Sequence, residues 1–207
     1  MSLKDRLVSN NNYYDKFLGK VGSRSINRDF SRSMDLFVQE VKPQGVVLDV
    51  GCGSGNHLEM FRERGLVAIG IDPCQAMRSI CISKGLKVMD GCFEDMPLIK
   101  ENVSGIWCAS SLLHVPKAEL GEVLKGLNLL IVEGGPLFVT VRIGTGSKWD
   151  SFDSTDSKID RRFIQLFEEE FLIEELIEAG FKVKDLIVED SYWGRESKWI
   201  SVVLTKM

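Results

Sequence analysis

The chain has 207 residues, of which 44% are apolar and 27% charged, and its formal net charge is −4. This composition is typical of one globular domain with a sizeable core, and the acidic balance argues against a nucleic-acid binder. Five cysteines without a Cys-x-x-Cys pair and two histidines indicate neither a disulfide framework nor a metal site. No apolar run approaches the roughly 18 residues of a membrane span. We therefore expect a single cytoplasmic domain over 1–207.

The first part of the chain is polar and then becomes amphipathic. Residues 1–25 contain an Asn-Asn-Asn run and two glycines, and we expect them to form an N-terminal arm or lid, with Tyr14 among its apolar anchors. Apolar residues then recur at helical spacing and predict a helix over 27–41. Pro43 and Gly45 end that helix before the first strand, 46–50.

Strands and helices alternate through the middle of the chain. Apolar, β-branched runs predict strands over 46–50, 66–71, 86–90, 105–110 and 137–141. Helical spacing lies between them, and Pro116 begins one of the helices. This alternation predicts an α/β domain with a parallel sheet and right-handed crossovers.

The pattern breaks after the fifth strand. Residues 142–167 are polar but carry aromatic residues, and we expect a folded insertion over the active edge of the sheet. A helix around 171–177 follows. Two further strands, 181–188 and 199–204, are joined by a loop too short for a crossover helix, so we expect them to be antiparallel.

The most informative stretch follows the first strand. Gly51, Gly53 and Gly55 predict a tight turn that lets backbone approach a ligand. A dinucleotide fingerprint would need a third glycine where Asn56 stands. Asp49, near the strand end, suits a cationic ligand group such as an ammonium or sulfonium better than a pyrophosphate. The alternative is an ordinary tight turn without a ligand.

Asp72 ends the second predicted strand. A carboxylate at the end of the neighbouring parallel strand can accept hydrogen bonds from a ribose diol. Asp is also a good helix N-cap, and the next helix begins near Pro73. Both roles are compatible.

These motifs resemble those of class I S-adenosylmethionine (SAM)-dependent methyltransferases. Asp49-Val50-Gly51-Cys52-Gly53-Ser54-Gly55 is similar to their first motif, Gly70-Ile71-Asp72 to their ribose-binding acid, and Glu94-Asp95-Met96-Pro97 to their adenine loop. Similar matches follow at 110–116, 133–136 and 174–181. The resemblance implies a three-layer Rossmann-like fold with seven strands in the order 3-2-1-4-5-7-6, strand 7 antiparallel, and SAM as cofactor.

The resemblance also implies a set of cofactor-binding residues, which are Tyr14, Asp49, Gly51, Cys52, Gly53, Gly55, Asn56, Asp72, Pro73, Phe93, Glu94, Asp95, Ala109 and Ser110. One position departs from the family pattern. Cys92 stands where the family often has an acid that faces the adenine amino group. Asp90, Glu94 or the backbone of Phe93 are the alternatives for that role.

A sulfonium methyl group is already activated, so the enzyme mainly aligns donor and acceptor and excludes water. His114 is the candidate general base, and the alternative is that it packs beside the cofactor. Candidate acceptor-pocket residues come from the 142–167 insertion and are Arg142, Trp149, Arg162 and Phe163. Trp199 is a candidate for the pocket rim.

Three functions are compatible with these motifs. The first is a methyltransferase acting on a small molecule. The second is a tRNA methyltransferase, motivated by basic residues of the arm, which are Lys4, Arg6, Lys16, Lys20, Arg24, Arg28 and Arg32, and by the Arg161-Arg162-Phe163 segment. The third is a non-catalytic SAM-binding module that regulates a partner.

Overall fold

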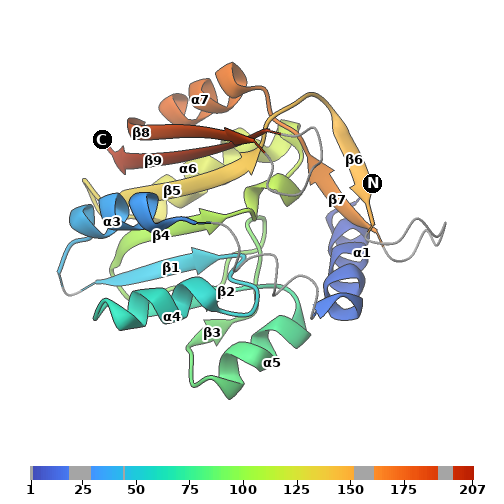
Figure 1. Ribbon diagram of the computed structural model, residues 1–207, viewed down its shortest axis with the longest axis horizontal. Coiled ribbons are helices and arrows are strands. Elements are labelled where there is room, and N and C mark those ends of the chain that lie inside the picture. Colours follow the sequence, from blue (N-terminus) through green and yellow to red (C-terminus); the bar gives the residue numbers. More distant parts are fainter. Residues whose placement is uncertain (1, 19–28, 44, 152–160, 191–197) are drawn as a thin grey trace.

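The computed structural model describes residues 2–18, 29–43, 45–151, 161–190 and 198–207. Helices cover both faces of a central sheet, and a further helix and a hairpin stand at one end of it (Figure 1). The predicted α/β class is therefore confirmed.

The central sheet has seven strands in the order β3-β2-β1-β4-β5-β9-β8. Their bounds are β1 Val46–Val50, β2 Ala68–Ile71, β3 Val88–Met89, β4 Val103–Ala109, β5 Pro136–Arg142, β8 Phe181–Asp190 and β9 Lys198–Lys206. All pairings from β3 to β5 are parallel, whereas β9 is antiparallel to both of its neighbours. The predicted strand order, including the antiparallel seventh strand, is confirmed.

Burial explains the sequence of these strands. All five residues of β1 are buried, as expected for a central parallel strand that helices cover on both faces. The edge strand β8 alternates between more and less exposed residues, because only one of its faces packs on the core. The predicted third strand, 86–90, is reduced to Val88–Met89 at the opposite edge.

Two helical layers enclose the sheet. The helices α3 Ser31–Glu40, α4 Asn56–Glu63 and α5 Gln75–Ser83 lie on one face, and α6 Leu120–Leu130 and α7 Glu169–Glu178 lie on the other (Figure 1). On the first face Trp107 of β4 stacks on Phe138 of β5, with ring centroids 3.7 Å apart, and Phe37 of α3 packs edge-on to Trp107. These buried aromatic rings fix α3 against the sheet.

Helix boundaries differ from the prediction at two places. The helix expected over 27–41 begins at Ser31, and residues 27 and 28 lie outside the described residues. The helix expected from Pro116 begins with a short 3₁₀ turn, η2 Lys117–Glu119, before α6. Another 3₁₀ turn, η1 Leu112–His114, follows β4. Among the described residues no helix is both long and apolar enough to cross a bilayer.

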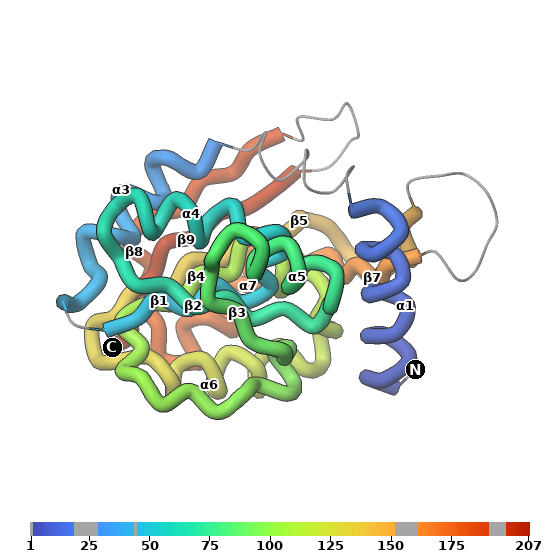
Figure 2. The backbone as a smooth tube through the Cα atoms, turned by 90° about the horizontal axis from the view of Figure 1, so that it is seen from below, coloured from blue at the N-terminus to red at the C-terminus, as the bar shows by residue number. Residues whose placement is uncertain are grey.

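The N-terminal segment forms a helix, α1 Leu3–Lys16, where the sequence predicted a polar arm. Ser2 and Asp5 form a capping box at its start, with the Ser2 hydroxyl 3.2 Å from the Asp5 backbone nitrogen. Figures 1 and 2 show α1 beside β7 Arg162–Gln165, which pairs with β6 Ser147–Asp150. This hairpin and α1 stand at the carboxyl ends of the parallel strands.

Candidate active site

A cavity of about 460 Å³ lies at the carboxyl ends of the parallel strands, within the size range of small-molecule sites. Its walls come from the segments that follow β1, β2 and β4, from the end of β5, from α1 and from β7. The sheet order reverses direction between β1 and β4. Open α/β sheets bind ligands at such a switch point.

The glycine turn after β1 forms one wall. Gly51, Gly53 and Gly55 have φ of +78°, +54° and +82°, which side chains rarely adopt. A Cβ on Gly51 would lie 2.3 Å from the Cβ of Ser111. The turn therefore needs glycine at position 51 both for its backbone conformation and for close packing against the segment after β4.

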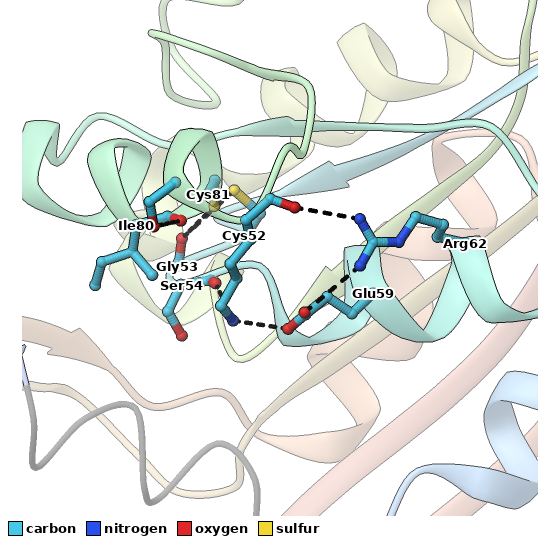
Figure 3. A network of polar contacts seen from close by, with 9 residues as sticks. Cys52, Gly53, Ser54, Glu59, Arg62, Ile80 and Cys81 are labelled. Atoms are coloured by element: carbon cyan, nitrogen blue, oxygen red, sulfur yellow. Dashed lines mark hydrogen bonds and ion pairs between the residues drawn. The ribbon is translucent and has the colours of Figure 1, made fainter.

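Polar contacts from α5 hold the outer side of this turn. The Cys81 thiol lies 3.2 Å from the Gly53 carbonyl oxygen, to which it donates (Figure 3). Lys84 Nζ donates to the Ser54 carbonyl at 3.0 Å and pairs with Glu59 at 2.7 Å. The turn is thus fixed before any ligand binds.

Asp72 joins the turns after β1 and β2. Its Oδ2 accepts a hydrogen bond from the Gly53 backbone N–H at 2.8 Å, and its Oδ1 accepts one from the Cys74 N–H at 2.9 Å. The side chain lines the cavity although the residue is only 7% exposed. Burial raises the pKa of Asp72 to about 6, against the two backbone hydrogen bonds and Arg78, which lower it. Each oxygen keeps acceptor capacity for a ligand hydroxyl.

Asp49 is buried beneath the glycine turn and is not among the residues that line the cavity, so its contact with a ligand stays a prediction. Within the part of the chain that the structure describes, neither of its carboxylate oxygens has a hydrogen-bond partner. Burial, followed by the charge of Asp72, raises the pKa of Asp49 well above its ordinary value. An acid left without partners in the core favours a cation nearby.

At the opposite end of the cavity, Arg162, Tyr14 and His114 form a directional chain of hydrogen bonds. His114 Nδ1 lies 2.7 Å from the Phe163 carbonyl, which can only accept, so Nδ1 carries the proton. His114 Nε2 then accepts from the Tyr14 hydroxyl at 2.7 Å, and Tyr14 accepts from Arg162 Nη1 at 3.0 Å. Burial, then the charge of Arg162, lowers the pKa of His114 to about 3.

These hydrogen bonds change the expected role of His114. Both ring nitrogens are engaged, and the imidazole is neutral at physiological pH. A general base would need the lone pair that the Tyr14 hydroxyl already occupies. The geometry therefore favours the alternative, a packing and positioning residue, over the free base that the sequence suggested.

Helix α1 is tied to the cavity by buried polar contacts. Arg6 is 3% exposed and pairs with Glu94 at 2.5 Å and Glu119 at 3.0 Å. Asn10 accepts from the Phe163 backbone N–H at 2.8 Å, and Asn11 donates to the Pro73 carbonyl at 3.2 Å. These contacts make α1 a wall of the cavity.

Most of the predicted site residues lie together. Those that line the cavity are Tyr14, Gly51, Cys52, Gly53, Asn56, Asp72, Pro73, Phe93, Glu94, Ala109, Ser110, His114, Arg142 and Arg162. Ser110 also has a φ of +60°, rare for a residue with a side chain, directly after β4. Trp199, considered for the rim, lines the cavity as well.

Trp149 and Phe163, which we expected in the acceptor pocket, are not among the residues that line the cavity. In the β6–β7 hairpin Trp149 is opposite Phe163, and Asp150 is opposite Arg162. Successive side chains of a strand point to opposite faces, so Arg162 and Phe163 cannot both face the cavity. The Phe163 ring packs edge-on against Trp149 instead, with centroids 5.8 Å apart.

Gly55 and Asp95 are also outside the cavity lining. Gly55 is the N-cap of α4, where a Cβ would lie 2.6 Å from a Leu86 methyl group, so its need for glycine is structural. Asp95 closes a short backbone turn with Cys92. The ligand contacts expected of these two residues therefore stay predictions.

The structure distinguishes the alternatives for the adenine-facing role at Cys92. Cys92 lines the cavity, and burial raises the pKa of its thiol to about 11, so it remains protonated. Asp90 pairs with Arg78 at 2.9 Å and does not line the cavity. Glu94 lines it but is paired with Arg6. Of the three alternatives, the backbone of Phe93 is the one without a competing ion pair.

Several further residues that line the cavity were not among the predicted ligand contacts. They are Arg6, Leu7, Asn10, Asn11, Phe30, Val50, Ser54, Cys74, Met77, Gly91, Ser111 and Val115. The residues of α1 carry no motif, and the local signal that could have predicted their helix is its Ser-x-x-Asp start. His57 also lies in the lining, with 9% exposure.

The sheet order, the antiparallel β9 and the cavity over a glycine turn define the Rossmann-like fold of class I methyltransferases. A family model described as a methyltransferase domain matches residues 47–135. Residues 47–135 are thus similar to a methyltransferase domain, and the sheet has the fold of class I methyltransferases.

Particular relatives agree with this class. An uncharacterised methyltransferase of Geobacillus thermodenitrificans is 31% identical over 115 residues, which cover 53% of this chain and 54% of that protein. A probable tRNA methyltransferase 9B of Bos taurus is 27% identical over 106 residues, 51% of this chain and 23% of that protein. The crystal structure of a SAM-dependent methyltransferase from Clostridium acetobutylicum has a TM-score of 0.69 at 17% identity, covering 93% and 98% of the two chains. The chain thus matches about half or less of these two sequence relatives.

Proposed function

We propose that the protein transfers the methyl group of SAM to a small-molecule acceptor. The observation that carries this proposal is Asp72, a buried carboxylate that lines the cavity one strand away from the glycine turn. Its two oxygens suit the two hydroxyls of a ribose. The orphaned Asp49 carboxylate beneath the turn favours the positive charges of the sulfonium and the ammonium group. These residues fit the cofactor that the family uses.

The remaining cavity residues divide between SAM and the acceptor. We assign the adenine end to Cys92 and Phe93, and the methionine end to Gly51, Gly53 and Asn56, all of which line the cavity. When bound, SAM supplies an activated methyl group. The protein then aligns the acceptor, for which the neutral His114 holds Tyr14 in place.

Helix α1 and the β6–β7 hairpin act as a cover in this proposal. Their side chains Arg6, Tyr14 and Arg162 line the same cavity as the glycine turn. Such a cover excludes water from the reacting groups. We accordingly treat residues 1–25 as a lid and 142–167 as an insertion of one domain, with residues 19–25 and 152–160 outside the described residues.

The tRNA alternative loses part of its motivation. Arg6 and Arg162, which the tRNA hypothesis would place on a basic surface, are buried in the cavity wall with side-chain exposures of 4% and 13%. Arg32 pairs with Asp185 at 2.7 Å. Lys20, Arg24 and Arg28 lie outside the described residues.

Calorimetry with SAM and S-adenosylhomocysteine tests the proposal directly. We expect both to bind with one site per chain and to compete with each other. Absence of binding by the folded chain would overturn the methyltransferase proposal. Binding without turnover of any acceptor would favour the regulatory module, and steeply salt-dependent tRNA binding would favour the tRNA enzyme.

A further inference from the structure

The arginine end of the cavity points to the chemical class of the acceptor, an inference that rests on the proposed function. Arg162 comes from β7 and Arg142 from the end of β5, and both line the cavity. Two cationic side chains at one end of a small-molecule site indicate an anionic ligand group.

Arg162 is held in place by aromatic and polar neighbours. Its guanidinium lies over the rings of Tyr13 and Tyr14, 4.9 Å and 5.7 Å from their centroids, and Nη1 donates to the Tyr14 hydroxyl. Within the described chain its Nε has no hydrogen-bond partner. The guanidinium is therefore oriented, with donor capacity left over.

Asp150 lies beside Arg162 but makes only long contacts with it. Asp150 Oδ2 lies 3.5 Å from Arg162 Nη2 and 4.0 Å from Arg142 Nη1. A strong Arg–carboxylate hydrogen bond is about 2.7–2.9 Å long and often bidentate. Asp150 thus reaches both guanidinium groups without making a close pair with Arg162, and a second carboxylate could make that pair.

Along the edge of the sheet, Arg142 lies at a distance from the proposed cofactor end. Gly51, at the proposed methionine end, follows β1 and Arg142 ends β5, and the order β1-β4-β5 puts two strand spacings between these strands. At about 4.8 Å per spacing this is roughly 10 Å. Tyr14 and Trp199 line the cavity near the arginines and suit the apolar body of an acceptor.

We propose that the acceptor is a small molecule with a carboxylate, and that Arg162 binds this carboxylate with Arg142 beside it. A competing source of the same chemistry is the carboxylate of the cofactor's own methionine part. The strand separation favours the acceptor, and the experiment distinguishes the two sources.

The test uses the full chain saturated with S-adenosylhomocysteine and two matched probes, benzoate and benzamide, titrated by NMR. We expect benzoate to bind at least tenfold more tightly than benzamide. Arg162→Gln should abolish this preference, and Arg162→Lys should retain part of it. Arg161→Gln is the matched control, because Arg161 is the chain neighbour of Arg162 but does not line the cavity; it should retain the preference.

Two results would overturn the inference. One is equal binding of benzoate and benzamide to the unmodified chain, a comparison that needs no variant to fold. The other is an Arg162→Gln chain whose affinity for S-adenosylhomocysteine falls while its preference for benzoate persists, which would assign Arg162 to the cofactor. If the unmodified chain binds no S-adenosylhomocysteine, the proposed function fails, and the probe comparison without cofactor still decides the anion site.

Discussion

The hydroxyl of Tyr14 lies 2.7 Å from Nε2 of His114, which joins helix α1 to the 3₁₀ turn after β4. The two residues are 100 positions apart in the chain. Because Arg162 donates to the same hydroxyl, these hydrogen bonds join three separate segments around one cavity. The N-terminal helix is thereby part of the site.

A double-mutant cycle on this pair tests that connection. Tyr14→Phe removes the donor to a buried ring nitrogen, and His114→Asn removes the acceptor. We expect each variant to lower the free energy of unfolding, with a coupling between them of about 0.5–1.5 kcal/mol, the net value of one hydrogen bond. Urea unfolding of the four proteins gives the coupling, and strictly additive losses would contradict the contact.

His114 should also make the stability depend on pH. Its pKa is about 3 in the folded chain and 6.5 as the ordinary value, so folding disfavours the protonated ring. The contribution is complete above pH 6.5 and is lost as the pH falls from 6.5 towards 3. His114→Gln should flatten this part of the stability–pH curve, measured by urea unfolding between pH 4 and 8. An unchanged slope in that variant would contradict the neutral, buried ring.

Asp72 should control cofactor affinity. Asp72→Ala is expected to weaken SAM binding by about 1–3 kcal/mol, the scale of hydrogen bonds to a charged group. Asp90→Asn is the matched control, because Asp90 is an acid of the neighbouring loop that does not line the cavity. Calorimetry should find the control close to the unmodified chain. Unchanged affinity in a folded Asp72→Ala chain would refute the ribose contact.

The pKa of Asp72 adds a pH dependence to the same binding. Since its pKa is about 6 and the ribose would bind the ionised carboxylate, SAM affinity should fall as the pH drops through 6. Asp72→Asn should bind more weakly and lose this dependence. Affinity that stays constant between pH 7.5 and 5 would show that ionised Asp72 is not required.

A comparison of Gly51 and Gly65 distinguishes the stability cost of backbone strain from that of close packing. Their φ values are +78° and +75°, but a Cβ at Gly65 meets nothing within 4 Å, whereas one at Gly51 would lie 2.3 Å from Ser111. Gly65→Ala should cost about 1–2 kcal/mol for the left-handed conformation. Gly51→Ala should cost more and also abolish SAM binding, as thermal unfolding and calorimetry would reveal. Equal losses of stability in the two variants would contradict the close packing.

The sequence was sufficient for the features that depend on local order. The apolar run 46–50, the alternating glycines and Asp72 are read from neighbouring residues, and consecutive parallel strands place their carboxyl ends together. Positions 51, 53 and 72 therefore line the cavity as expected.

Strand register decided which residues of the insertion reach the cavity. Arg162 and Phe163 are adjacent in the sequence, and pairing of Asp150 with Arg162 turns one to the cavity and the other away from it. Nothing local fixes that choice, because a slip of one residue would exchange the two faces.

The sequence by itself determined the sheet, the glycine turn and the acid at the end of β2, since each follows from hydrophobic pattern and turn chemistry. Only the tertiary structure decided that α1 is a wall of the site, that Asp49 is buried beneath it and that His114 is engaged on both nitrogens. The physical reason is that burial and long-range hydrogen bonds join segments as far apart as Tyr14 and Arg162. Such contacts set the chemistry of the acceptor end, where the sequence carries no motif.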